Sequence, residues 1–399
     1  MAGVFVLSQN LIGGDVEPFL EEISEYGFKS INLAMKYHAS RNLIIRGGVN
    51  LLHLEDGAHY YPVDSSCYSD LSVAPQTYPT HISTAKISRL MELSCSYGIS
   101  VGAWSVFLHD SKFARDNADC VTSNAFSNHI FPNLCPANPR VQSYLFGHIR
   151  DLLQLGFSHL SVESINFAPF KHNEHHERYF VDLSKITEFL LALCFCKYCQ
   201  IAGQEFDCDT QRLQFQIREK LQAALEDVDP WVKFDLTKEI LFEIFDSQLM
   251  NYLAGRASTI EKLHSDFSAI TRSFGTKTRF LDSTPLSNRE SSTTYDDLWI
   301  QGASIENIAK NFDFIEPLLY RWTTEENVGI AKNYQTFMGI GLPTIAAIRP
   351  VFPDVNDLSL LRNRVEEIKN LGVNDLDFYL WDIIRLNELL EIKSILLEG

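Results

Sequence analysis

The sequence predicts a (β/α)8 barrel, the TIM-barrel fold, with long loops after its strands and an enlarged helical insertion after the fourth strand. Short apolar segments alternate with amphipathic segments of helical period along the chain. Parallel strands need crossover connections, and helices then cover the outer face of the sheet. An open doubly wound sheet is the alternative. It typically carries a glycine-rich phosphate turn after its first strand, and Gly13-Gly14 is a weak match to that turn.

The segments expected to form the barrel strands are short and apolar. The first begins at Val4, close to the start of the sequence, and the fourth carries Glu163 near its end. In chain order, the expected strands are 4–9, 28–35, 99–108, 157–167, 278–282, 312–320, 343–349 and 375–380.

The helical segments between these strands have recognisable ends. Gly98 suits the position that closes a helix in left-handed backbone geometry. Asn138 followed by Pro139 predicts an N-cap and the first residue of the next helix. The expected helices outside the insertions are 16–26, 83–97, 139–155, 304–311, 325–338, 356–370 and 384–397, and a further helix is expected over 183–194, after the fourth strand.

Two insertions interrupt the alternation, and we interpret residues 1–399 as a single barrel domain that carries both. Residues 36–80 are rich in glycine, proline and tyrosine. A loop of that length in a compact domain usually serves function. Residues 181–272 have a mainly helical pattern, interrupted at Pro230, and this helical layer is larger than a barrel needs.

The composition and net charge of the chain argue against some classes of binding partner. The chain has 399 residues, is 45% hydrophobic and has a formal net charge of -17, which argues against nucleic acid as a partner. The sequence starts without the features of a signal peptide, and no apolar run reaches the roughly 18 residues that span a bilayer. Eight cysteines without a secretion signal favour free thiols or a metal site. We therefore expect a cytoplasmic protein with no membrane partner, whose oligomeric state is left open.

Carboxylates recur where the predicted strands end. In a barrel, the carboxyl ends of the strands face the active site. Glu163 is flanked by Val162 and Ile165, and an unpaired charge there would cost several kcal/mol. We expect Glu163 and Glu316 to be the catalytic pair, with Asp282 and Asp382 as alternates. The other interpretation of each carboxylate is a helix cap or the partner of an arginine.

Aromatic, basic and amide side chains accompany these carboxylates. Sugar rings stack on aromatic faces, and polar groups take the sugar hydroxyls. The residues expected to bind substrate are His38, Trp104, His109, Asn166, His175, His176, Tyr320, Arg321, Arg349 and Trp381. The histidine-rich stretch around His175 could instead bind a metal ion or lie on the surface without chemical consequence. Its spacing does not match the helical zinc motif HExxH.

The strongest cysteine signal is the spacing of Cys194, Cys196 and Cys199, with Cys208 as a candidate fourth ligand. Three soft ligands within six residues suit a structural zinc ion. The alternative is a set of buried thiols packed at the end of a helix. The expected reaction itself requires no cofactor.

Four stretches together carry a resemblance to a family. They are Leu134–Pro139, Val162–Ser164, His175–Glu177 and Leu193–Cys199, and the sequence resembles a family of largely uncharacterised bacterial proteins with glycoside-hydrolase-like TIM barrels. The resemblance extends over roughly Val4 to Asp382. It implies a barrel distantly similar to the α-galactosidase and amylase type, whose strand-four carboxylate is the nucleophile. That role falls on Glu163 here, although aspartate is more common at the position, and the strand-six partner falls on Glu316.

These observations predict a glycoside hydrolase or an allied carbohydrate-processing enzyme acting on a small sugar or an oligosaccharide. Paired carboxylates can protonate the leaving oxygen and attack the anomeric carbon or activate water. One alternative is a metal-dependent sugar isomerase or epimerase that uses Glu163, His109, Asp282 and a histidine of the strand-four loop. The other is a sugar-binding barrel without catalysis.

Overall fold

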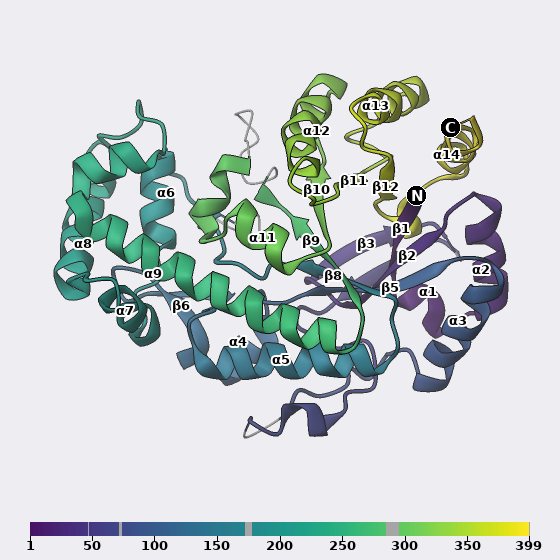
Figure 1. Cartoon of the computed structure of the whole chain (residues 1–399), viewed down its shortest axis with the longest axis horizontal. Helices are drawn as coiled ribbons and strands as arrows, with labels where there is room; N and C mark the ends of the chain where they lie inside the picture. The colour runs from purple at the N-terminus through teal and green to yellow at the C-terminus, as the bar shows by residue number, and fades with distance from the viewer. Residues whose placement is uncertain (47, 72–73, 172–177, 285–294, 399) are drawn as a thin grey trace.

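The closed barrel predicted from the sequence is confirmed. The computed structural model describes residues 1–46, 48–71, 74–171, 178–284 and 295–398. Across these ranges, eight parallel strands pair in the order β1-β12-β11-β10-β9-β8-β5-β2 and close into a barrel (Figure 1). The barrel strands are β1 (Ala2–Leu7), β2 (Ser30–Lys36), β5 (Ser100–Val106), β8 (His159–Glu163), β9 (Lys277–Asp282), β10 (Phe314–Leu319), β11 (Ile345–Ile348) and β12 (Asp375–Phe378).

Helices cover the outside of this barrel at the expected positions. Asn138 caps α5, because its side chain accepts a hydrogen bond from the Arg140 backbone N–H, and Pro139 is the first helical residue. Thr323 and Glu326 form a reciprocal capping box at the start of α12. The outer helices are α2 (Val16–Glu25), α3 (Thr84–Ser96), α5 (Pro139–Gln154), α11 (Ile305–Asn311), α12 (Thr324–Met338), α13 (Leu358–Asn370) and α14 (Leu386–Glu398), with the short α1 (Gln9–Ile12) after β1.

The strand that carries Glu163 is shorter than expected. The sequence predicts strand over 157–167, whereas β8 ends at Glu163. Ser164 has a φ of 56°, outside the range of extended backbone, so the chain leaves the sheet directly after Glu163. This break places Glu163 at the carboxyl end of the fourth barrel strand.

Polar side chains fill part of the barrel interior. Asn32 on β2 contacts His159 on β8 and Asp377 on β12, and neither strand is a neighbour of β2. Two glycines make room for these groups. A Cβ atom at Gly102 would lie 2.2 Å from the His159 ring, and one at Gly3 would lie 2.2 Å from the Asp377 carboxylate. These side chains therefore fill part of the barrel interior.

Two long loops, residues 36–80 and the loop after β5, contain structure that the sequence pattern does not reveal. Residues 36–80 include an antiparallel hairpin of β3 (Ser40–Ile44) and β4 (Asn50–Leu54) and a short turn of helix, η1 (Ser65–Tyr68). The loop after β5 contains α4 (Ser111–Asp116), η2 (Ala118–Cys120) and a second hairpin of β6 (Val121–Ser123) and β7 (His129–Leu134).

The helical insertion after β8 forms a lobe beside the barrel, at the left of Figure 1. It contains α6 (Lys185–Ala192), α7 (Lys197–Gln204), α8 (Thr210–Glu226) and the first part of α9 (Lys238–Ser273). The later part of α9 runs along the barrel beside α5 and leads back to β9 (Figure 1). Helix α9 has a break at Asp246, where φ is 57°. In the described part of the chain, no single helix is long and apolar enough to cross a membrane, and only α6 and α7 together, bent by 103°, pass that test.

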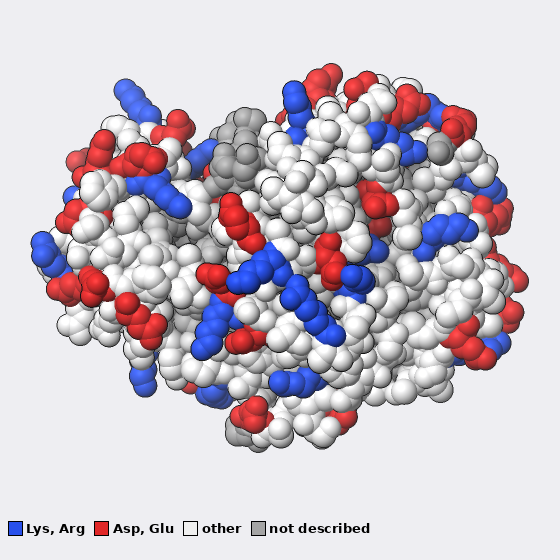
Figure 2. Space-filling view, viewed as in Figure 1, with Lys and Arg blue, Asp and Glu red and all other residues white. Residues whose placement is uncertain are grey.

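The remaining short helices are η3 (Tyr295–Gln301) before α11 and η4 (Trp381–Ile383) after β12. Charge on the surface is mixed. Figure 2 shows acidic and basic side chains interspersed over the face drawn, although the chain as a whole carries a formal net charge of -17.

Candidate active site

A cavity of about 530 Å³ lies where the barrel strands end. Its lining includes Glu163, the last residue of β8, and residues that directly follow β10, β11 and β12. This is the end of the barrel at which the fold places active sites. The residues predicted to bind or react with substrate that line this cavity are His38, Trp104, His109, Glu163, Asn166, Tyr320 and Arg349.

The Glu163 carboxylate is held on both oxygens. The indole N–H of Trp104, on the neighbouring strand β5, donates to Oε2 at 2.8 Å. The Nε2 atom of His38 lies 2.9 Å from Oε1. The Glu163 side chain is 12% exposed, so these contacts are largely shielded from bulk water while the carboxylate still reaches the cavity. The arrangement fixes the orientation of the carboxylate and leaves it facing the site.

A histidine and carboxylate cluster adjoins Glu163. His38, Asp56 and His109 come from three different segments, and each offers a potential ligand atom within 4.8 Å of the others. The Oδ2 atom of Asp56 accepts a hydrogen bond from the Ser111 backbone N–H at 2.7 Å and lies 3.5 Å from Nε2 of His109. The Oδ1 atom of Asp56 is buried without a hydrogen-bond partner among the described residues.

The protonation of His38 depends on its neighbours. Burial alone would lower the pKa of the imidazole, but the nearby carboxylates of Glu163 and Asp56 outweigh it, so the pKa of His38 is raised. A raised pKa favours imidazolium beside the Glu163 carboxylate. His38 can therefore donate a charged hydrogen bond to Glu163 or supply a proton within the cavity.

A buried ion pair supports this wall of the cavity. Nζ of Lys36, at the end of β2, lies 3.0 Å from Oδ2 of Asp110, and both side chains are almost fully buried. The same Asp110 caps α4 and accepts a hydrogen bond from the Tyr144 hydroxyl at 2.6 Å. Burial opposes ionisation of Asp110, but Lys36 and these donors together lower its pKa. The network fixes the backbone next to His38 and His109.

Aromatic rings line much of the remaining surface. Tyr37 and Trp104 lie with ring centroids 4.3 Å apart, and the hydroxyls of Tyr37 and Tyr379 are 2.9 Å apart. The guanidinium of Arg349 lies over the Tyr320 ring at 5.2 Å and forms a fork onto the Asp354 carboxylate. The cavity therefore combines rigid apolar faces with a few fixed polar groups, the combination found in small-molecule sites.

The other three predicted catalytic carboxylates lie outside the cavity lining. Glu316 is 0% exposed inside the barrel, and burial together with the neighbouring Asp377 raises its pKa well above the usual range. Asp282 faces α12, where it accepts a hydrogen bond from the Tyr334 hydroxyl at 2.6 Å. Asp382 accepts hydrogen bonds from the Leu7 backbone N–H and from the Asn10 amide. None of these three carboxylates therefore lines the cavity, although Glu316 is close enough to Glu163 for their charges to interact.

Two of the predicted binding residues are also placed elsewhere. Trp381 is 1% exposed and packs edge-on against Phe19 and Phe28, so it has no free face for a sugar ring. Arg321 is buried next to Asn327, at the start of α12, and does not line the cavity. Asn166 does line the cavity, but its Oδ1 atom is already 3.0 Å from Nε2 of His264. The predicted residues His175 and His176 lie outside the described residues.

The cavity lining also contains residues that were not among the predicted site residues, and three of them, Tyr37, Asp56 and Tyr379, carry polar groups of chemical interest. Asp56 lies in the long 36–80 insertion, where an Asp-Gly turn is a visible but unspecific signal. Tyr37 directly follows β2, and Tyr379 directly follows β12. The strand-end rule that selected Trp104 and Glu163 therefore also applies to these two tyrosines.

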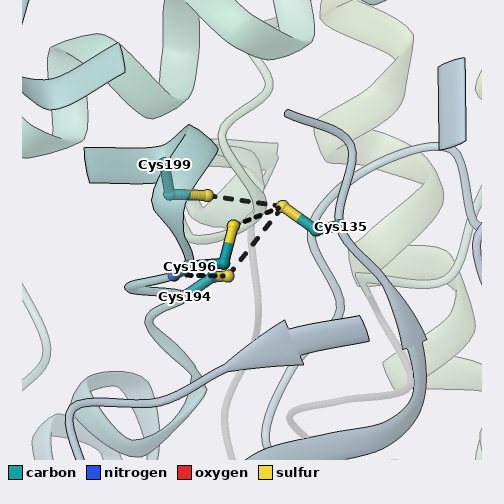
Figure 3. A group of neighbouring side chains, drawn as sticks. All are labelled: Cys135, Cys194, Cys196 and Cys199. Carbon is teal, nitrogen blue, oxygen red and sulfur yellow. Dashed lines mark hydrogen bonds between the residues drawn. The ribbon is translucent and has the colours of Figure 1, made fainter. Parts of the chain in front are cut away.

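A four-cysteine cluster lies outside the cavity lining and could hold a structural metal such as zinc. It joins the predicted Cys194, Cys196 and Cys199 to Cys135, in place of the predicted Cys208 (Figure 3). Cys208 is buried at the turn before α8 and does not belong to this group. The fourth thiol follows β7 and lies next to the other three only in the folded chain. Sequence spacing alone therefore cannot indicate it.

The chain is similar to known proteins in its fold and not in its sequence. No protein-family model and no curated protein matches its sequence. Alpha-L-fucosidase isoenzyme 2 from Paenibacillus thiaminolyticus aligns with a TM-score of 0.53 at 10% identity, over 100% of this chain and 49% of that one. The β-galactosidase of the psychrophilic Marinomonas ef1 aligns with a TM-score of 0.54 at 8% identity, over 100% of this chain and 59% of that one.

A third solved structure gives the same result. The β-galactosidase of the Antarctic haloarchaeon Halorubrum lacusprofundi has a TM-score of 0.57 at 8% identity, over 100% of this chain and 57% of that one. The chain thus spans between 49% and 59% of the length of these three structures. The likeness shows that the chain shares the barrel fold of these three enzymes, and it assigns no catalytic residue.

Proposed function

We propose that this chain is a carbohydrate-processing enzyme of the glycoside-hydrolase type, with Glu163 as its central catalytic carboxylate. The observation that carries the proposal is the setting of Glu163. It ends a barrel strand, faces a cavity lined by aromatic rings, and is oriented on both oxygens by Trp104 and His38. The shared fold of sugar-cleaving barrels supports the substrate class.

Asp56 replaces Glu316 as the proposed second carboxyl group. It is the other acidic side chain in the cavity lining among the described residues, and its Oδ1 atom has no hydrogen-bond partner there. In the proposed reaction, Asp56 or the neighbouring His38 donates a proton to the leaving glycosidic oxygen. Glu163 attacks the anomeric carbon or removes a proton from the attacking water. The reaction breaks the bond between the anomeric carbon and the leaving oxygen, and the oxygen of the water molecule forms a new bond to the anomeric carbon.

The aromatic lining supplies the binding part of the proposal. The C–H faces of a sugar ring would stack on Tyr37, Trp104 or Tyr320, while Arg349, fixed by Asp354, would take a hydroxyl or an acidic substituent. Preorganised side chains lose little entropy on binding. The proposed hydrolysis requires no cofactor, and a zinc ion held by the four cysteines would have a structural role.

Replacement of Glu163 by glutamine tests the proposal. Glutamine keeps the shape and can still accept the hydrogen bond from Trp104, so the fold and sugar binding should persist. Loss of the ionisable group should reduce turnover by at least about 10³-fold on a substrate found in a panel of aryl and natural glycosides. The Asp56→Asn variant should lose about 10²–10⁴-fold. Near-wild-type turnover by Glu163→Gln would refute the assignment, and binding without turnover by the wild-type chain would favour a sugar-binding barrel.

The cluster of His38, Asp56 and His109 favours a second candidate, a metal-dependent sugar isomerase or epimerase. Two imidazoles and a carboxylate are suitable ligands for a divalent transition metal. Its ligand set differs from the predicted one, because Asp282 faces α12. Elemental analysis separates the two candidates. A stoichiometric ion that persists in Cys196→Ser but disappears in His109→Ala would favour the metal-dependent enzyme.

A further inference from the structure

The four thiols of Cys135, Cys194, Cys196 and Cys199 converge from two parts of the chain. Cys135 follows the hairpin strand β7, and the other three lie between α6 and the first turns of α7. The Cys135 Sγ atom is 3.4 Å from those of Cys196 and Cys199 and 3.9 Å from that of Cys194. Figure 3 shows the Cys135 side chain pointing at the other three.

These separations match a metal site and not a disulfide. A zinc–thiolate bond of about 2.3 Å in tetrahedral geometry places neighbouring sulfur atoms about 3.8 Å apart. A disulfide would require about 2.05 Å between the sulfur atoms. All four cysteines are free thiols, and the ligand atoms all lie within 4.8 Å of one another. One ion can therefore contact all four.

The surroundings also suit thiolate ligands. The backbone N–H groups of Ser123 and Cys196 lie within hydrogen-bonding distance of the Cys194 sulfur, at 3.3 and 3.5 Å. Such donors stabilise metal-bound thiolates. Arg256, which is 3% exposed, interacts electrostatically with Cys135, Cys194 and Cys199. Its Nε and one terminal nitrogen have no hydrogen-bond partner among the described residues. A zinc ion with four thiolates carries two negative charges, and the guanidinium would offset part of them.

The cluster connects the helical insertion to the wall of the cavity. Phe131 and Pro132 on β7 line the cavity a few residues before Cys135. The guanidinium of Arg256, on α9, lies 3.9 Å from the centre of the Phe167 ring, which is also part of the cavity lining. Cross-linking through a metal would therefore restrain the β6–β7 hairpin against α6, α7 and α9.

We propose that Cys135, Cys194, Cys196 and Cys199 bind one structural zinc ion that fixes the β6–β7 hairpin and with it one wall of the cavity. The proposed site takes zinc without an open coordination position, so it has no part in chemistry. It does not rest on the proposed sugar hydrolysis, because its ligands and its tests are independent of any substrate.

Metal analysis of the purified chain tests the site directly. We expect roughly one zinc per chain by mass spectrometry of the elements, and Co²⁺ exchanged into the site should give the intense visible absorption of a tetrahedral thiolate complex. Cys135→Ser and Cys196→Ser should lose most of this zinc. Cys208→Ser is the matched control, because Cys208 is a buried thiol outside the cluster and should retain it.

Hydrogen exchange tests the structural role even if the serine variants fold poorly. Zinc removed from the wild-type chain by a chelator should speed amide exchange over 129–135 by at least about tenfold, with a smaller effect on β1 and β2, and zinc should restore protection. A chain without zinc that gives no thiolate spectrum with Co²⁺ would overturn the proposal. So would iron as the resident metal, or zinc that is lost in Cys208→Ser and kept in Cys135→Ser.

Discussion

Asp382 offers a quantitative test of the distinction between structural and catalytic carboxylates. The side chain is 1% exposed and accepts the Leu7 N–H at 3.0 Å, and burial raises its pKa to about 7. An aspartate in an unfolded chain titrates near 3.9, so the folded state holds the proton about 3 pH units longer. At 1.36 kcal/mol for each unit, the expected effect on stability is about 4 kcal/mol.

Because the pKa of Asp382 is raised in the folded state, the free energy of unfolding falls as the pH rises. Below about pH 4 the carboxyl is protonated in both states, and its contribution to folding is fully present. Between about pH 4 and pH 7 the unfolded chain ionises first, so stability is lost as the pH rises through the folded pKa. Asp382→Asn cannot ionise, and its amide oxygen can still accept the Leu7 N–H. The wild-type chain should therefore lose about 4 kcal/mol relative to Asp382→Asn between pH 4 and pH 8.

Denaturant unfolding of both proteins at several pH values measures this difference. Other groups titrate equally in both chains and cancel. Asp64→Asn is a control of opposite sign, because hydrogen bonds from Ser66 lower the pKa of the exposed Asp64 carboxyl. A pH-independent difference for Asp382→Asn would show that Asp382 is not a buried neutral acid. A loss of turnover beyond about tenfold in this variant would return Asp382 to the catalytic candidates.

Two further predictions concern the groups that hold Glu163. Trp104→Phe removes a hydrogen bond to a carboxylate, worth about 1.5–3 kcal/mol, and should lower kcat/KM about 10- to 150-fold. Trp381→Phe, an equally buried change outside the cavity, should affect stability alone, and equal kinetics in the two variants would contradict the role of Trp104. His38→Gln should destabilise the protein more at pH 6 than at pH 9 in unfolding experiments. The reason is that the raised pKa of His38 makes its contribution to stability strongest at low pH. A larger loss of stability at pH 9 than at pH 6 would contradict the pairing of His38 with Glu163.

The order of the barrel elements could be predicted because local patterns determine it. Apolar runs mark the buried parallel strands, and the Asn138-Pro139 pair marks the start of α5, as observed. The hairpin β3–β4 was not predicted, since its strands are partly exposed and carry no continuous apolar run. Patterns of this kind identify the strands and helices and their order along the chain, but they do not determine the structure within long loops.

The candidate site was predictable only in part, because the facing of a side chain depends on register and on distant contacts. Glu163 and Asp282 both end barrel strands, yet Glu163 faces the cavity and Asp282 faces α12. Glu316 points into the barrel, and its neighbour there, Asp377, is far away in sequence. Cys135 joins thiols about 60 residues away, which only the closed fold brings together.

We propose that Glu163, and not the buried Glu316, carries the reaction. Single-turnover rates of Glu163→Gln and Glu316→Gln on the same glycoside test it directly, with sugar affinity measured for both variants. We expect Glu163→Gln to lose at least about 10³-fold with unchanged affinity, and Glu316→Gln to stay within about tenfold of the wild-type rate. A fast Glu163→Gln variant beside an inactive, folded Glu316→Gln variant would show that Glu316, and not Glu163, is the catalytic carboxylate.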